Sequence, residues 1–193
     1  MGSFPPNANI TRAGPGGAGR SAAAEAILVA LGANLPGRTG AAPLESCRQA
    51  LAMMPDHGIE VVRRSRWFVS APVPPGAQPD YVNAVVEVAS ARGPEALLAA
   101  LHRIEDRLGR VRSRPNAARI IDLDLIAHGR IRRDAADGCP AGLVLPHPRL
   151  HERAFVLLPM ADLVPDWRHP ASGATLEEMI AALPPGQRCA PLC

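Results

Sequence analysis

The order in which strand-like and helix-like segments follow one another constrains the fold of this chain more than any other feature. Runs rich in branched apolar residues, often alternating with polar ones, predict strands over residues 26–31, 58–69, 81–89 and 119–126. Apolar residues at helical spacing predict helices over residues 44–54 and 94–108. Pro94 opens the second helix and Gly109 ends it, as these residues commonly do. The resulting order is β-α-β-β-α-β.

This order is that of the split βαβ unit, so we predict an α+β, ferredoxin-like βαββαβ antiparallel sheet with helices packed on it. A short strand near 143–145 and helical segments near 151–163 and 175–183 predict a C-terminal helical extension. A length of 193 residues suits one domain, which we place at 25–183. Residues 1–24, rich in Gly, Ala and Pro, are expected to form a flexible N-terminal tail, and 184–193 a C-terminal tail.

The composition excludes several classes of protein. The chain has no apolar run of about 18 residues, so no membrane span is expected. Its four cysteines form no CxxC pair, which disfavours a zinc site or a disulfide framework and favours a cytoplasmic location. All 21 basic residues are Arg, so every charged contact with phosphate must come from guanidinium groups.

The strand over 119–126 carries two acids on one face. Asp122 and Asp124 lie two residues apart, so their side chains point the same way, about 7 Å from each other. Two carboxylates on an otherwise apolar strand repel each other unless a cation lies between them. Mg²⁺ suits such a pair because it takes a few carboxylates and fills its other positions with water and phosphate oxygens. The alternative is a solvent-facing edge strand with two ordinary acids.

A run of arginines precedes this strand. Its members are Arg107, Arg110, Arg112, Arg114 and Arg119. A basic loop leading into a metal strand suits polyphosphate binding, although such runs are often only solvated loops. Binding of nucleic acid through its phosphates is the rival interpretation. Aromatic residues make up only 3% of the chain, too few for stacking on bases, so we expect no nucleic-acid partner.

Two other segments carry candidate binding residues. In the first, His147 lies between two prolines, and Arg153 and Phe155 follow it; the alternative is an amphipathic helix with Phe155 in the core. In the second, Tyr81, the only tyrosine, shares a strand face with Asn83. A ring beside an amide suits a flat heterocycle, which needs stacking and paired hydrogen bonds. A surface Tyr beside a strand-start Asn remains the alternative. The absence of a GxxxxGK[ST] motif excludes a P-loop.

Taken together, these segments resemble the 6-hydroxymethyl-7,8-dihydropterin pyrophosphokinase family of folate biosynthesis. The resemblance is carried by LGAN (31–34), SAPVPPGAQPDYVNAVVEV (70–88), RIEDRLGRVR (103–112), ARIIDLDLI (118–126) and LPHPRLHERAFVLLPMADLVPDW (145–167). It implies a ferredoxin-like fold and an enzyme that transfers pyrophosphate from ATP to the pterin hydroxymethyl group, releasing AMP. An inactive nucleotide- or pterin-binding protein of the same fold is the alternative.

The resemblance also implies residue roles. Asp122 and Asp124 would hold two Mg²⁺ ions, and Arg110 and Arg119 would act with them in catalysis. The nucleotide would be bound by His102, Glu105, Arg110, Arg112, Arg119, Leu125, His147 and Arg153, and the pterin by Ser70, Val73, Tyr81, Asn83 and Phe155. The expected partners are these two small substrates, and the expected state is a monomer.

The chain departs from the family pattern at three places. The loop at 114–118 lacks the Trp that family members often carry, so a stacking cover over the pterin is weaker or made differently. His102 stands where Gln is frequent, and Ser70 where Thr is frequent.

Overall fold

The computed structural model describes residues 25–111, 117–134 and 143–192. The expected N-terminal tail at 1–24 and Arg112 therefore lie outside the described residues. The strands are β1 (Ile27–Ala33), β2 (Glu60–Arg64), β3 (Phe68–Ser70), β4 (Tyr81–Ala89), β5 (Asp122–His128) and β6 (Cys189–Pro191). The α-helices are α2 (Pro43–Met53), α3 (Pro94–Arg107), α4 (Ala154–Leu163) and α5 (Leu176–Ala181), with short 3₁₀ turns at Pro55–His57 and Leu150–Glu152.

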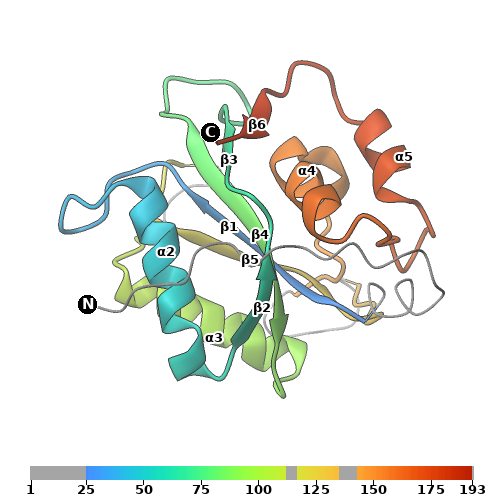
Figure 1. Cartoon of the computed structure of the whole chain (residues 1–193), viewed down its shortest axis with the longest axis horizontal. Coiled ribbons are helices and arrows are strands. Elements are labelled where there is room, and N and C mark those ends of the chain that lie inside the picture. Colours follow the sequence, from blue (N-terminus) through green and yellow to red (C-terminus); the bar gives the residue numbers. More distant parts are fainter. Residues whose placement is uncertain (1–24, 112–116, 135–142, 193) are drawn as a thin grey trace, which may run out of the picture.

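All six strands join one sheet in the order β5-β1-β4-β3-β6, and β2 also pairs with β4. Every pairing is antiparallel. The predicted α+β class and the ferredoxin-like order of its elements are thus confirmed, because β1 and β4 lie in the centre with β5 outside β1 and β2 and β3 outside β4 (Figure 1).

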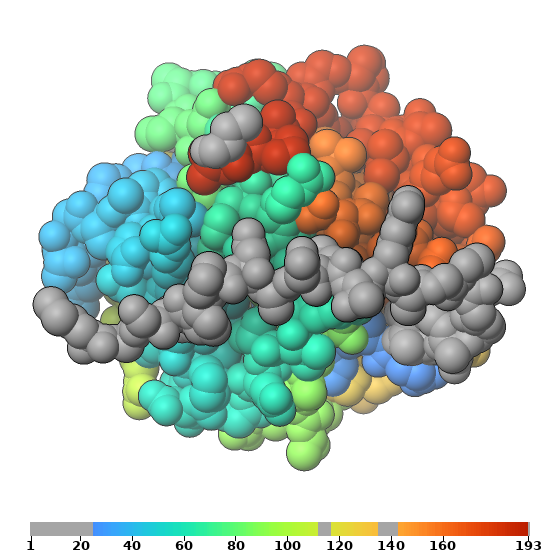
Figure 2. Space-filling view, viewed as in Figure 1, coloured from blue at the N-terminus to red at the C-terminus, as the bar shows by residue number. Residues whose placement is uncertain are grey.

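Two hydrophobic cores cover the two faces of the sheet. On one face, α2 and α3 pack against Val29 and Leu31 of β1 and against Leu123 and Leu125 of β5. On the other face, α4 and α5 pack against residues that include Leu28 of β1. Figure 1 shows α2 and α3 gathered on one side and α4 and α5 on the other. In the space-filling view, the segment around β2 and β3 lies between α2 and the orange and red α4–α5 region (Figure 2).

The expected strand over 58–69 is in fact two strands, and Ser65 explains the break. Its hydroxyl accepts a hydrogen bond from the Val85 amide at 3.1 Å and donates one to the Arg66 carbonyl at 2.7 Å. A side-chain oxygen thus replaces a backbone carbonyl in the ladder, which competes with regular pairing. β2 also shifts register between Val61 and Arg63.

The C-terminal region differs from prediction in two further ways. Part of the expected tail at 184–193 forms β6, which pairs with β3 through Val69 and Ala190. The expected strand near 143–145 is reduced to one bridge between Arg133 and Leu145. Within the described ranges, no helix combines the length and apolar character that crossing a membrane requires.

Candidate active site

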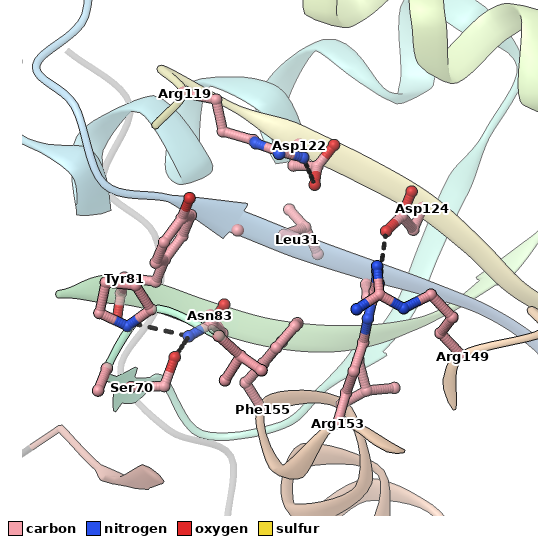
Figure 3. Close-up of a pocket in the computed structure, with 16 residues that line it drawn as sticks. Leu31, Ser70, Tyr81, Asn83, Arg119, Asp122, Asp124, Arg149, Arg153 and Phe155 are labelled. Atoms are coloured by element: carbon pink, nitrogen blue, oxygen red, sulfur yellow. Dashed lines mark hydrogen bonds and ion pairs between the residues drawn. The ribbon is translucent and has the colours of Figure 1, made fainter. Parts of the chain in front are cut away.

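A pocket opens on the face of the sheet that α4 covers, where β4, β1 and β5 lie side by side (Figure 3). Its lining draws on all three strands, on the loop after β3 and on the start of α4. The lining residues that the sequence singled out are Ser70, Val73, Tyr81, Asn83, Arg119, Asp122, Asp124, Arg153 and Phe155.

The floor of the pocket is the backbone of β1. Gly32 pairs with Asn83 of β4 on one side and with Asp122 of β5 on the other. A methyl group at Gly32 would lie 3.2 Å from the Asn83 side-chain oxygen. The missing side chain therefore leaves a low floor between the amide on β4 and the carboxylate on β5.

Asp122 is held by two arginines. Arg110 Nη1 lies 2.5 Å from Asp122 Oδ1, and Arg119 Nη1 lies 2.5 Å from Asp122 Oδ2. All three side chains are largely enclosed, with exposed fractions of 16–21%. Burial opposes the charge on Arg110, but Asp122 and Glu105 outweigh it and raise the pKa of the guanidinium. The Arg110 guanidinium thus stays charged beside Asp122.

Asp124 is less well compensated. Arg153 Nη1 lies 3.5 Å from its Oδ2, which is a long contact for an ion pair. Burial, together with the neighbouring charge of Asp122, raises the pKa of Asp124 to about 6. The charged form of Asp124 is therefore poorly stabilised by its surroundings, as expected of a carboxylate that binds a cation.

These residues suit Mg²⁺ better than a metal whose ligands come mainly from protein side chains. Among the described residues, no group of three or more His, Cys, Asp or Glu side chains comes together as a metal site. Asp122 and Asp124 would hold the ion, and water and substrate phosphate would complete its shell, as is usual for Mg²⁺.

The opposite side of the pocket carries an amide and two aromatic rings. Asn83 Nδ2 donates to Ser70 Oγ at 2.9 Å, and both side chains are buried. The Tyr81 hydroxyl lies 3.1 Å from Gln78 Oε1, and burial raises its pKa. Phe155 enters from α4, with the Arg153 guanidinium 5.5 Å from its ring centroid. Tyr81 and Phe155 line one pocket although they are far apart in sequence (Figure 3).

Five predicted residues that the structure describes lie outside this lining: Arg110, which contacts Asp122, and four others. Glu105 is fully buried on α3, beneath β5. Leu125 is 2% exposed and its side chain packs in the α2–α3 core, so only its backbone could contact a nucleotide. His147 lines a separate cavity together with residues that include His169. Burial, with help from Arg153 and Arg149, lowers the pKa of His147 to about 4. His102 lies on α3 and is half-buried.

The sequence assigned no role to seven residues of the pocket, although all but Ala30 stand in segments that carry the family resemblance. They are Ala30, Leu31, Gly32, Ala71, Pro72, Arg149 and Val156. A signal existed for Gly32, because a glycine near the end of an apolar strand often marks close approach of a ligand or of another backbone. Arg149 stands next to the prolines that flank His147, but nothing in the spacing shows that it reaches the pocket.

Comparison with known proteins agrees with this geometry. Residues 28–165 match the family model of 7,8-dihydro-6-hydroxymethylpterin-pyrophosphokinase. The chain belongs to this family. A pyrophosphokinase of the family from Pseudomonas aeruginosa is 38% identical over 161 residues, which cover 82% of this chain and 91% of that protein. One from Synechocystis is 41% identical over 123 residues, which cover 64% of this chain and 60% of that protein.

Other family relatives are longer proteins. The folic acid synthesis protein fol1 of Pneumocystis carinii is 36% identical over 152 residues, and this chain spans only 19% of its length. Among solved structures, the wild-type Plasmodium falciparum HPPK-DHPS with STZ-DHP matches 81% of this chain and 43% of its own length, with a TM-score of 0.60 and 12% identity. At that identity the likeness supports the fold alone.

Proposed function

We propose that this chain transfers pyrophosphate from ATP to the hydroxymethyl group of 6-hydroxymethyl-7,8-dihydropterin, giving AMP and the pterin diphosphate. The observation that carries the proposal is the placement of Asn83 and Asp122 on either side of Gly32. One pocket thus combines an amide-and-aromatic wall for a flat heterocycle with an acidic and arginine-rich wall for a metal-bound polyphosphate.

In this proposal the pterin hydroxyl oxygen attacks the β-phosphorus of ATP. A new oxygen–phosphorus bond forms, the bond between the bridging oxygen and the β-phosphorus breaks, and AMP leaves with that oxygen. The hydroxyl proton passes to solvent or to a nearby carboxylate. Tyr81 and Phe155 would stack on the pterin and Asn83 would bond its edge, so the hydroxyl is held near the β-phosphorus.

Arginines would supply most of the side-chain positive charge around the phosphates. Arg119 and Arg153 line the pocket, and Arg110 contacts Asp122 at its edge. Their fixed guanidinium groups would stabilise charge that moves from the pterin oxygen toward AMP. Enclosure by β1, α4 and the loop after β3 would limit competition from water.

Asp122 and Asp124 would hold two Mg²⁺ ions. Bound there, the ions would neutralise the triphosphate and make the β-phosphorus a better electrophile. Arg112, His102, His147 and the Leu125 backbone are further candidates for contacts with the nucleotide. We also propose a cytoplasmic monomer that acts on small molecules and binds no nucleic acid.

Incubation of the protein with ATP, Mg²⁺ and 6-hydroxymethyl-7,8-dihydropterin tests the proposal. We expect AMP to form in proportion to pterin consumed, and Asp122→Ala to lose nearly all activity. Asp166→Ala, which changes an exposed aspartate, is the matched control. If the wild type binds both substrates yet forms no AMP, the chain is a binding protein and the proposed activity is wrong.

A further inference from the structure

One buried acid lies outside the pocket lining. Glu105 lies on the core face of α3 with an exposed fraction of 0%, and it is the only Asp or Glu among the buried residues of the described chain. Its neighbours on that helix face include Leu101 and Ile104. Burying a carboxylate costs several kcal/mol unless charged and hydrogen-bonded partners compensate.

Glu105 has partners on two different elements. Its Oε1 accepts a hydrogen bond from the backbone amide of Leu123 at 2.7 Å, between the two metal-site acids of β5. The same oxygen forms an ion pair with Arg110 Nη1. Arg110 in turn contacts Asp122 Oδ1 at 2.5 Å. A continuous chain of contacts therefore joins the interior of α3 to a pocket carboxylate.

The end of α3 explains why Arg110 can make both contacts. Gly109 has a φ of 87°, a left-handed conformation that glycine adopts readily. The Gly109 amide bonds the Asp106 carbonyl at 3.0 Å, and the Arg110 amide bonds the Glu105 carbonyl at 3.0 Å. This is the Schellman pattern, in which the second residue after the helix returns to its last turn. The two side chains that meet are commonly apolar, whereas here they are an acid and a base.

We infer that Glu105 is a positioning residue that anchors Arg110 and the backbone of β5, so that Asp122 and the guanidinium are already in place for metal and triphosphate. Glu105 acts from below the pocket, without contact with the nucleotide. A bound cation would compete with Arg110 for the Asp122 oxygens, and the Glu105 contact would keep the displaced guanidinium beside the phosphates. This inference deepens the proposed function and rests on it for the identity of the ligand.

The first experiment is a double-mutant cycle on Glu105→Gln and Arg110→Ala. The glutamine keeps an oxygen for the Leu123 amide but lacks the charge that holds Arg110. We measure binding of α,β-methylene ATP with Mg²⁺ by titration calorimetry, together with kcat and KM for AMP formation. Glu105→Gln should weaken analogue binding or lower kcat by about 10–100-fold, the loss typical of residues that orient metal ligands. Its KM for the pterin should stay near the wild-type value.

The decisive result is the double variant. If Glu105 acts through Arg110, then Glu105→Gln adds little in the Arg110→Ala background, because contacting residues in one network are not additive. Wild-type behaviour of Glu105→Gln, or losses that multiply, would overturn the inference. Glu95→Gln is the matched control, since it removes a half-exposed acid of the same helix that pairs with Arg133 at 2.9 Å. If the wild type forms no AMP, the proposed function fails while the calorimetric cycle still tests the Glu105 coupling.

A second measurement covers the case in which Glu105→Gln does not fold. Amide exchange at Leu123 is compared between the wild type and Arg110→Ala. Loss of the guanidinium removes the ion pair that holds the Glu105 carboxylate. We therefore expect exchange at Leu123 to be faster in Arg110→Ala than in the wild type, with a smaller change at Leu28 of β1. Unchanged exchange at Leu123 would show that the chain of contacts is not coupled, and the inference would be wrong.

Discussion

The Asn34 side-chain oxygen accepts a hydrogen bond from the backbone amide of Arg119 at 2.8 Å. Asn34 is 2% exposed, and its Nδ2 donates to the Pro79 carbonyl at 3.1 Å. The backbone amide of Asn34 also bonds the Arg119 carbonyl at 3.0 Å. One buried amide thus joins the loop before Tyr81 to the segment that leads into β5.

Replacing Asn34 should therefore weaken both the fold and the site. Asn34→Ala leaves the Arg119 amide and the Pro79 carbonyl without this partner, and we expect a loss of about 1–3 kcal/mol in the free energy of unfolding. Urea denaturation measures this loss. Asn34→Asp keeps an acceptor for the Arg119 amide but places a buried carboxylate oxygen against the Pro79 carbonyl, so a loss at least as large as that of Asn34→Ala is expected. A stability of Asn34→Ala equal to that of the wild type would contradict the bridging role.

The raised pKa of Asp124 predicts that the free energy of unfolding depends on pH. Its pKa is raised to about 6, above the ordinary value of about 4, so the folded protein binds this proton more tightly than the unfolded chain. The contribution of Asp124 to stability is present below about pH 4 and is lost as the pH rises through about 6. Asp124→Asn should thus stabilise the metal-free protein at pH 7.5 more than at pH 4.5, as measured by urea denaturation.

The same substitution should lower the proposed activity. We expect Asp124→Asn to lower activity by on the order of a hundred-fold or more, because a group that stabilises the transition state electrostatically is lost. Mg²⁺ with the ATP analogue should raise the melting temperature of the wild type and leave that of Asp124→Asn nearly unchanged. A variant that is both less stable at pH 7.5 and fully active would contradict this account of Asp124.

Substitution of either aromatic residue should weaken binding of one substrate and leave binding of the other nearly unchanged. Tyr81→Ala and Phe155→Ala each remove a ring from the wall that we assign to the pterin, and stacking on such rings contributes about 1–3 kcal/mol. Titration calorimetry should show this loss for the pterin and little change for the ATP analogue. Equal losses for both ligands would contradict the assignment.

Gly32→Ala tests the floor of the pocket. The added methyl group would lie 3.2 Å from Asn83 Oδ1 and 4.0 Å from Tyr81 Cδ1, so it occupies space beside the pterin wall and displaces the Asn83 amide only slightly. We expect pterin affinity to fall by about ten-fold or more, while the free energy of unfolding changes by about 1 kcal/mol or less. Calorimetry and urea denaturation measure the two effects. Unchanged pterin affinity would mean that the ligand does not rest on β1.

Local patterns predicted much of the sheet because its central strands are regular. β4 has the predicted bounds, Tyr81–Ala89, since valine and other apolar residues dominate the run. The break at Ser65 depends on a hydrogen bond to a strand twenty residues away, and β6 exists only because it meets β3. Neither contact leaves a local signal in the sequence.

The site was predictable where side chains alternate along a strand. Asp122 and Asp124 line the pocket while Leu123 and Leu125 enter the core, as period-two alternation requires. Glu105 could not be placed in this way. A helical periodicity shows that it shares a face with apolar residues, but its partners come from the helix end and from β5, which only the folded chain brings together.

Each of the two hydrophobic cores supports a residue that we assign to a different substrate. Glu105 belongs to the α2–α3 layer, whereas Phe155 is delivered by α4 from the layer on the other face. Softening one layer should therefore disturb one substrate before the other. Truncation of Leu101, in the first layer, is expected to weaken binding of metal and nucleotide. Truncation of Met160, in the second layer, is expected to weaken binding of the pterin. On heating, we therefore expect the affinities for the two ligands to fall at different temperatures.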